Sequence, residues 1–141
     1  MLLEAVESLK NDDLIIRCIV AAVKLANVAI EGLDTDGGLC YEYEPSENLL
    51  LKQKHWCPKA EAIVGFINAR QVSKEEKYLQ HTYRSWQFIQ QFILDKKNGK
   101  LFWEVNEDYI TMKEEDKVGI WKCPYHNSRV CIEIIIRLSV E

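Results

Sequence analysis

The chain has 141 residues, of which 48% are hydrophobic and 28% charged, and its formal net charge at pH 7 is -4. This composition is typical of a folded globular protein and excludes extensive disorder. The negative balance, with no basic cluster that could follow a phosphate backbone, argues against nucleic acid as a partner. We expect a single domain over residues 1–141, because a chain of this length can bury about 68–70% of the surface that its unfolded form exposes.

The beginning of the sequence has no basic segment followed by a long apolar one, so we expect no signal peptide. The most apolar stretch, residues 14–30, is interrupted by Arg17, Lys24 and Asn27, which argues against a membrane span. The five cysteines lack C-x-x-C spacing, which favours reduced thiols in a cytoplasmic protein without a metal site or cofactor.

Helical patterns dominate the first half of the sequence. We expect a short helix over residues 1–10 and a second from Asp12 or Asp13, as its N-cap, to near Gly32. The polar residues of the second helix form one narrow stripe. A helix that is apolar over most of its circumference should be surrounded by neighbours.

The middle of the chain predicts a short extended piece over residues 39–43 and then two helices. Pro58 stands in the first turn of the first helix, which should end near Gln71. Ser73 and Glu76 have the spacing of a capping box for the next helix. Five apolar residues of that helix should share one face: Leu79, Tyr83, Trp86, Ile89 and Ile93.

Asn98-Gly99 predicts a turn inside a short hairpin, and the last helix should run from about Pro124 to Leu138. The resulting pattern is all-α. Helix pairs are joined by long connections that carry small strands or hairpins.

Two of these connections carry similar groups of residues where they enter a helix: "KHWCPKAEA" at 54–62 and "IWKCPYHNSR" at 120–129. Each has a tryptophan, a Cys-Pro pair and ionisable residues in the first helical turns. The free N–H groups and partial positive charge of a helix N-terminus favour electron-rich oxygens. The candidate site residues are therefore Trp56, Glu61, Trp121, His126 and Arg129.

Each of these residues also has an ordinary structural explanation. A glutamate or histidine in a first turn is commonly a capping residue, and tryptophans commonly pack in a core. We favour a pocket because a histidine, a glutamate, an arginine and two tryptophans stand at equivalent ends of helix pairs. Histidine is also the natural acid and base near neutral pH.

At this point the sequence resembles a known family. "HWCPKAEAIVGFINA", "GKLFWEVNED" and "EEDKVGIWKCPYHNSR" are similar to the C-terminal part of the N-acylglucosamine 2-epimerase and cellobiose 2-epimerase superfamily. In that family, W-W-P-x-x-E and W-K-x-P-Y-H-x-x-R segments border the active site of an (α/α)6 barrel. The second segment is matched nearly completely. The first departs at Cys57, where a second tryptophan is usual.

The resemblance implies about three helix pairs of such a barrel, together with its chemistry. His126 would be one of two catalytic histidines, Trp56 and Trp121 would line the sugar site, and Glu61 and Arg129 would contribute polar contacts. The reaction removes the C2 proton of an open-chain aldose or N-acylhexosamine, forms an enediolate and returns a proton to the opposite face.

The resemblance covers only about the last third of a family member. The family's other histidine belongs to an H-x-x-E segment upstream of the first residue of this sequence. We therefore expect a truncated epimerase with half of an active site, which self-associates or docks with a separate N-terminal half. The alternatives are a non-catalytic sugar-binding or interaction module, and an inactive gene remnant.

Overall fold

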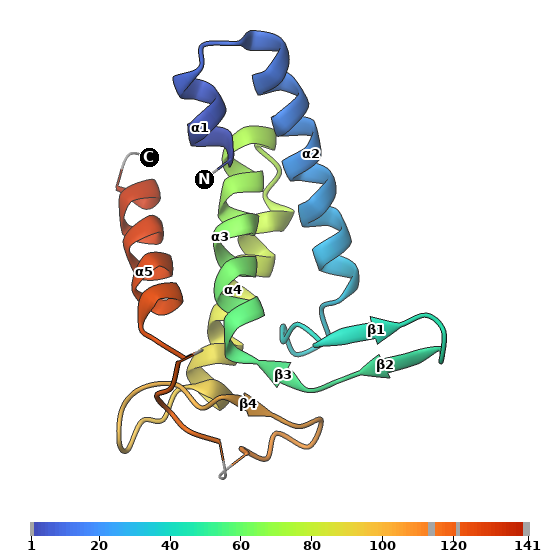
Figure 1. Ribbon diagram of the computed structural model, residues 1–141, viewed down its shortest axis with the longest axis vertical. Helices are drawn as coiled ribbons and strands as arrows, with labels where there is room; N and C mark the ends of the chain where they lie inside the picture. The colour runs from blue at the N-terminus through green and yellow to red at the C-terminus, as the bar shows by residue number, and fades with distance from the viewer. Residues whose placement is uncertain (1, 113–114, 121, 140–141) are drawn as a thin grey trace.

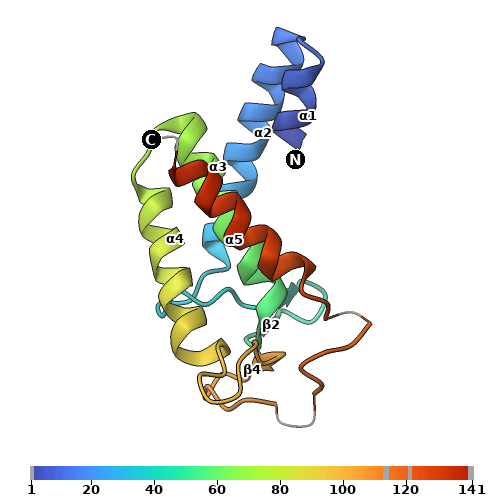
Figure 2. The same cartoon turned by 90° about the vertical axis from the view of Figure 1, so that its left-hand side faces the viewer.

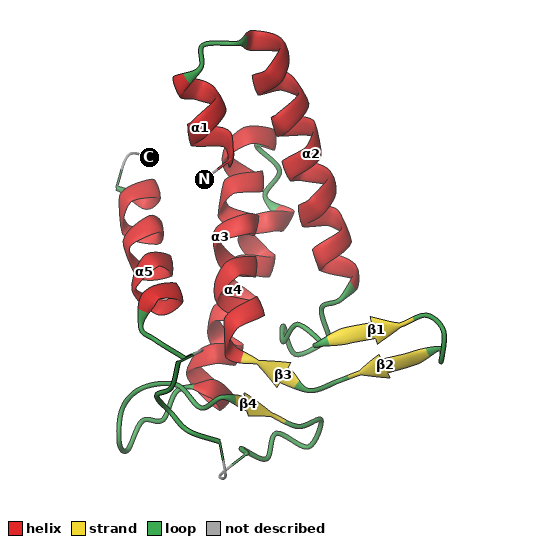
Figure 3. Cartoon of the chain, viewed as in Figure 1, coloured by secondary structure: helices red, strands yellow, loops and turns green. Residues whose placement is uncertain are grey.

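The computed structural model describes residues 2–112, 115–120 and 122–139. The helices are α1 (Leu2–Ser8), α2 (Asp12–Glu31), α3 (Trp56–Ser73), α4 (Lys77–Phe88), which continues into the π-helical turn η1 (Ile89–Ile93), and α5 (Tyr125–Leu138). The strands are β1 (Glu42–Glu44), β2 (Leu49–Leu51), β3 (Lys54–His55) and β4 (Glu104–Val105). Figure 3 shows that helices make up most of the described chain, so the all-α prediction is confirmed.

Helix α3 is the centre of the arrangement. It packs against α2, α4 and α5, and α2 and α5 lie on opposite sides of it (Figure 1). The strands and long loops gather at the end of the bundle where α3 and α5 begin (Figures 1 and 2). Both segments that the sequence singled out therefore enter their helices at the same end of the molecule.

The core surrounds α3 because this helix carries buried side chains on more than one face. Ile63, Phe66 and Ile67 are almost completely buried. One cluster joins α3 to η1, β4 and α5, and a second joins α3 to α2 and α4. Pro58 lies in the first turn of α3, as predicted, where its missing N–H removes no helical hydrogen bond.

Helix α2 departs from two predictions. Its N-cap is Asn11, whose Oδ1 accepts a hydrogen bond from the Leu14 N–H at 3.0 Å, so Asp12 and Asp13 stand inside the first turn. The apolar circumference is also not surrounded by other described elements. Ala26 is the buried residue of α2, while a row of large side chains is exposed: Ile16, Val20, Leu25 and Val28.

Helix α4 differs from its prediction in the same way. The capping box does not form, because Ser73 ends α3 and Lys74 adopts a left-handed conformation with φ 63° before the new helix begins at Lys77. The buried face of α4 contains Tyr78, Thr82, Ser85 and Phe88. Tyr83 and Trp86, which we expected on the shared apolar face of this helix, are exposed.

The connections contain two antiparallel strand pairs. β1 pairs with β2, with Glu42 opposite Leu51, so the extended piece predicted over residues 39–43 is the start of a hairpin. β3 pairs with β4, with His55 opposite Glu104. Asn98-Gly99 forms the predicted turn, with Gly99 at φ 73° and an isolated bridge from Leu94 to Leu101 in place of longer strands.

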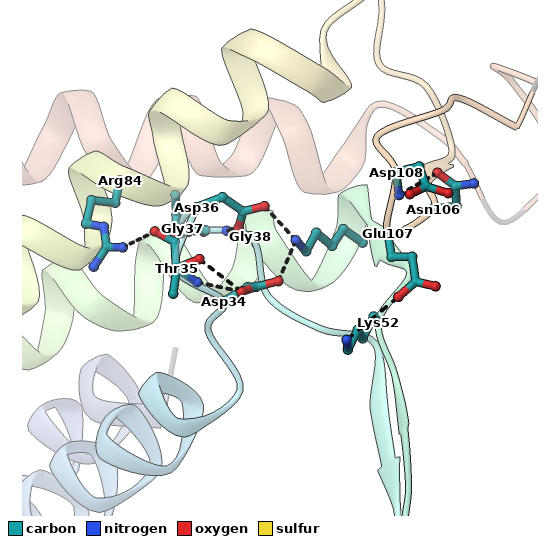
Figure 4. Close-up of polar contacts among 12 residues, drawn as sticks. Asp34, Thr35, Asp36, Gly37, Gly38, Lys52, Arg84, Asn106, Glu107 and Asp108 are labelled. Atoms are coloured by element: carbon teal, nitrogen blue, oxygen red, sulfur yellow. Dashed lines mark hydrogen bonds and ion pairs between the residues drawn. The ribbon is translucent and has the colours of Figure 1, made fainter.

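The loop between α2 and β1 is fastened to β3 by a buried lysine. Lys54 is 1% exposed, and its ammonium group lies 2.9 Å from Asp34 Oδ2 and 2.6 Å from Asp36 Oδ2. Figure 4 shows this loop, in which Asp36 also accepts a hydrogen bond from the Gly38 N–H and Arg84 of α4 reaches the Thr35 carbonyl. Since β3 leads directly into Trp56, this ion cluster fixes the start of α3.

Candidate functional site

The approach to α5 is held in place by Lys122. This side chain is buried, donates a hydrogen bond to the Leu101 carbonyl at 2.6 Å and places its ammonium group over the rings of Trp56 and Trp103. Burial lowers the pKa of Lys122 to about 8, with the charge of Lys117 acting in the same direction. The contacts connect the loop before α5 to the start of α3.

Glu61, His126 and Arg129 form one polar cluster. Glu61 lies one turn from the start of α3, and the other two residues lie in the first turns of α5. The Glu61 carboxylate is 2.8 Å from His126 Nδ1 and accepts hydrogen bonds from Arg129 Nη1 at 3.0 and 2.8 Å. The packing of α5 on α3 thus brings together three of the residues predicted from the sequence.

The charge of Glu61 determines what His126 can do. Burial acts to raise the pKa of the Glu61 carboxyl, but hydrogen bonds from His126 and Arg129 outweigh it and hold the pKa below its ordinary value. An ionised carboxylate only accepts hydrogen bonds, so the neutral imidazole must carry its proton on Nδ1. Nε2 of His126 then keeps its lone pair and can act as a base.

Two aromatic rings limit the movement of the imidazole. Trp56 meets His126 edge to face with ring centroids 5.7 Å apart, and Tyr125 does so at 5.2 Å. About one third of the His126 side chain remains exposed. The ring is therefore held in one orientation and can still be reached from outside.

Of the two candidate tryptophans, the structure describes Trp56. Trp56 is only 2% exposed and belongs to the core cluster around α3. Trp121 lies outside the described residues. That the two tryptophans line a sugar site stays a prediction. Cys57 is half-buried against the same core cluster as Trp56.

The other two histidines are engaged elsewhere. His55 stacks on Tyr41 and contacts the carboxylate of Glu104, and burial lowers its pKa. His81 Nδ1 is buried without a hydrogen-bond partner among the described residues, and the His81 ring lies against Phe66. Neither ring belongs to the polar cluster of Glu61, His126 and Arg129.

Sequence reasoning did not identify the two lysines that support this site. Lys54 looks like an ordinary surface residue in the sequence, and Lys122 belongs to the matched family segment but received no role, yet both are buried. The available signal was their position beside aromatic residues, next to His55 and Trp121 respectively. All five cysteines are free thiols.

Among residues 2–112, 115–120 and 122–139, no group of three or more histidine, cysteine, aspartate or glutamate side chains is placed to hold a metal ion. None of the helices described here is both long and apolar enough to cross a membrane.

Comparison with known proteins identifies the relatives of this chain. The model of the family described as N-acylglucosamine 2-epimerase (GlcNAc 2-epimerase) matches residues 1–128. The cellobiose 2-epimerase of Bacteroides fragilis is 36% identical over 135 residues, and that of Dictyoglomus turgidum is 38% identical over 136. Each match covers 96% of this chain and 34% of the relative.

Solved structures agree with these matches. A sugar epimerase from a ruminal bacterium superposes with a TM-score of 0.89 and 36% identity, over 96% of this chain and 35% of its own. The cellobiose 2-epimerase of Bacillus thermoamylovorans B4167 superposes with a TM-score of 0.76 and 36% identity, over 82% of this chain and 29% of its own. The chain thus spans about a third of the length of these relatives.

Proposed function

This chain belongs to the N-acylglucosamine 2-epimerase family, and from that membership we propose that it supplies one half of the active site of a sugar 2-epimerase. The proposed substrate is an open-chain aldose or N-acylhexosamine, epimerised at C2. The proposed base is His126, oriented by Glu61 and Arg129. The observation that carries the proposal is the polar cluster in which Glu61 joins both His126 and Arg129.

The proposed step moves one proton. The C2–H bond of the open-chain sugar breaks and its electron pair forms the C1=C2 double bond, while the π pair of the C1 carbonyl moves onto O1 to give the enediolate. The proton goes to Nε2 of His126. The imidazolium that results has Nδ1–H beside the Glu61 carboxylate, which stabilises its charge. Arg129 keeps the carboxylate ionised in both states.

Epimerisation needs a second acid, which returns a proton to the opposite face of C2. Neither His55 nor His81 is placed for this role, because both lie against other partners. The chain corresponds to about a third of its relatives, whose structures are (α/α)6 barrels. We therefore assign the second histidine and the opposite wall of the pocket to barrel segments that residues 1–141 do not cover.

The same observation favours a second candidate function. A chain that presents the partly exposed His126 together with Arg129, without the second acid, could hold a sugar without turning it over, as a sugar-binding or interaction module. Loss of binding on changing His126 or Arg129, with no proton exchange at C2, would identify this function. An inactive remnant would show neither binding nor exchange.

The test is hydrogen–deuterium exchange at C2, followed by NMR in heavy water, with cellobiose, mannose and N-acetylmannosamine. A working base gives exchange that His126→Ala abolishes. Glu61→Gln should weaken exchange, because an amide no longer stabilises the imidazolium. His55→Gln serves as the control histidine variant outside the cluster. Exchange that survives His126→Ala contradicts the proposed role of His126.

Partner and location complete the proposal. We propose that the chain works in the cytoplasm, in a complex with further barrel segments or with copies of itself. Size-exclusion chromatography with light scattering measures the complex directly, and a strictly monomeric chain that binds no apolar dye would argue against it.

A further inference from the structure

A small hollow lies beside the start of α5, between the loop that precedes this helix and the turn that follows η1. Its volume is about 140 Å³. Three lysines line it, together with a thiol and an amide: Lys100, Lys117, Lys122, Cys123 and Asn127. No acidic side chain of the described residues lines this hollow, so its walls carry an excess of positive charge.

Lys122 carries a buried charge with no carboxylate against it. It is 4% exposed, and its ammonium group donates a hydrogen bond to the neutral Leu101 carbonyl at 2.6 Å and lies over two tryptophan rings. Within the described ranges, Glu115 acts on it through charge and not through a hydrogen bond. Buried charges in proteins are normally paired, as Lys54 is with its two carboxylates. A negative partner for Lys122 is therefore expected from outside the described chain.

The neighbouring lysines make the hollow more positive. Burial is the main cause that lowers the pKa of Lys122 to about 8, and the charge of Lys117 acts in the same direction. Lys122 therefore keeps its proton for the most part at pH 7. The carboxylate of Asp95 is engaged by Lys117, whose hydrogen bond holds the pKa of that carboxyl below its ordinary value. Lys100 adds a third cation from an exposed side chain.

The frame of the hollow is fixed by hydrogen bonds within the chain. Asp95 accepts hydrogen bonds from the backbone N–H groups of residues 97 and 98 and so holds the turn that leads to Lys100. The same carboxylate binds Lys117, which comes from the loop before α5. Because one side chain holds both walls, a ligand would enter a site whose ordering cost is largely met.

The volume and the donors of the hollow fit one tetrahedral oxyanion. Water occupies about 30 Å³ per molecule in the liquid, so about 140 Å³ corresponds to between four and five waters, close to the five heavy atoms of phosphate or sulfate. An ammonium group has three N–H donors, and Lys122 gives one of them to Leu101. Helix α5 adds the N–H groups of its first turn, because its N-cap Pro124 makes no side-chain hydrogen bond to them.

We propose that this hollow binds one tetrahedral oxyanion, either inorganic phosphate or the phosphoryl group of a small metabolite, between Lys100, Lys117 and Lys122. The anion supplies the negative charge that Lys122 lacks and joins the loop before α5 to the turn after η1. The site is separate from the polar cluster around Glu61, none of whose members lines the hollow. It does not depend on the proposed function.

The test follows the alkylation of Cys123 in the full chain by mass spectrometry, with iodoacetamide as an uncharged reagent and inorganic phosphate as the ligand. Cys123 is exposed and lines the hollow, while Cys131 is exposed outside it and serves as the reference. Phosphate at about ten times its dissociation constant should slow the alkylation of Cys123 by about tenfold and leave Cys131 unchanged. Sodium chloride at the same ionic strength should protect neither thiol.

Lysine variants locate the binding. Lys117→Gln should weaken phosphate binding by about tenfold or more, which corresponds to about 1.4 kcal/mol, because it removes one ammonium group and leaves Asp95 uncovered beside the anion. Lys100→Gln changes an exposed side chain that folding does not need, and it should weaken binding by about threefold. Lys96→Gln is the matched control, since Lys96 is exposed on the same turn but does not line the hollow.

Sulfate isolates the titration of the protein, because its own charge does not change between pH 7 and pH 9.5. Since the pKa of Lys122 is about 8 and the anion binds the protonated amine, sulfate affinity should fall by about tenfold or more over this range. Glycerol 3-phosphate distinguishes the two sources of the anion. Protection of Cys123 by inorganic phosphate alone identifies the free ion as the ligand, and equal protection by both identifies a phosphoryl group.

Three results would overturn the proposal. They are protection of Cys123 that sodium chloride reproduces, phosphate affinity unchanged in both Lys100→Gln and Lys117→Gln, and an equal loss of affinity in Lys96→Gln.

Discussion

Replacing Lys54 by methionine should destabilise the protein strongly, since it removes the only cation from the buried cluster with Asp34 and Asp36. The ammonium group has both carboxylates within hydrogen-bond distance and is almost completely buried. Removing one partner of a buried ion pair typically costs about 3–5 kcal/mol. Because more than a third of the Asp34 side chain is exposed, water compensates part of this loss, so we expect about 3 kcal/mol.

The pH dependence of this loss follows from the pKa of Asp34. The hydrogen bond from Lys54 is the largest cause that holds this pKa below its ordinary value of 3.8. A carboxyl with a depressed folded-state pKa stabilises the protein above its unfolded pKa, and that contribution disappears as pH falls through the folded value. The difference between wild type and Lys54→Met should therefore be complete at pH 7 and shrink below about pH 4.

The assay is urea unfolding followed by far-ultraviolet circular dichroism at pH 7 and at pH 3.5. A triple variant, Lys54→Met with Asp34→Asn and Asp36→Asn, is the matched control. It removes the uncompensated charges and should recover at least half of the lost stability. A loss below about 1 kcal/mol at pH 7, the size expected of an exposed ion pair, would refute the reasoning. So would a loss that does not change with pH.

Three further changes test the packing. Lys59 is completely buried, and this burial lowers its pKa to about 7, so Lys59→Met should raise the free energy of unfolding at pH 7 relative to wild type. The difference in free energy of unfolding between the two proteins should narrow towards pH 10, because the unfolded chain then also loses that proton. A difference in urea unfolding that stays constant with pH would contradict this. Phe88→Ala should lower the free energy of unfolding by about 3–5 kcal/mol in the same assay, because the Phe88 side chain is 1% exposed. Tyr83→Ala should lower it by less than about 1 kcal/mol, because Tyr83 is exposed. Equal losses in the two variants would be inconsistent with the observed burial. Asn11→Ala should lower the free energy of unfolding by about 1 kcal/mol through loss of the α2 N-cap, and Asp12→Ala should lower it clearly less. A larger loss with Asp12→Ala would instead identify Asp12 as the N-cap.

The sequence predicted the helices well because their signals are local. The Pro58 position, the Asn98-Gly99 turn and the start of the last helix near Pro124 each depend on a few neighbouring residues, and each agrees with the structure. The N-cap of α2 was assigned one or two residues too late because Asn11 and the two following aspartates are all good capping residues.

Which face of each helix is buried could not be predicted from local signals. Hydrophobic periodicity identifies an apolar face but does not say whether that face meets a described neighbour. On α4 the predicted face includes Tyr83 and Trp86, which line a hollow between α4 and α5, while a neighbouring face with Thr82 and Ser85 is buried. Ser85 can be buried because its hydroxyl donates a hydrogen bond to the Gly37 carbonyl, a partner far away in the sequence.

In the candidate site, too, the sequence identified the residues but not the contacts between them. Glu61, His126 and Arg129 were selected from two separate segments, and the packing of α5 on α3 joins them. The particular contact, in which one carboxylate holds both the imidazole and the guanidinium, depends on the relative position of two helices. No local pattern encodes it, and the supporting burial of Lys122 was missed for the same reason.

The most direct test of the account is C2 epimerisation by the chain together with the N-terminal two thirds of the Bacteroides fragilis enzyme, with cellobiose as substrate and NMR in heavy water as the readout. We predict that the mixture forms the C2 epimer with deuterium at C2, that neither part does so alone, and that His126→Ala in this chain abolishes the reaction. Epimer formation that persists with His126→Ala, or a stable complex that leaves the C2 proton unexchanged, would contradict the assignment of the catalytic base.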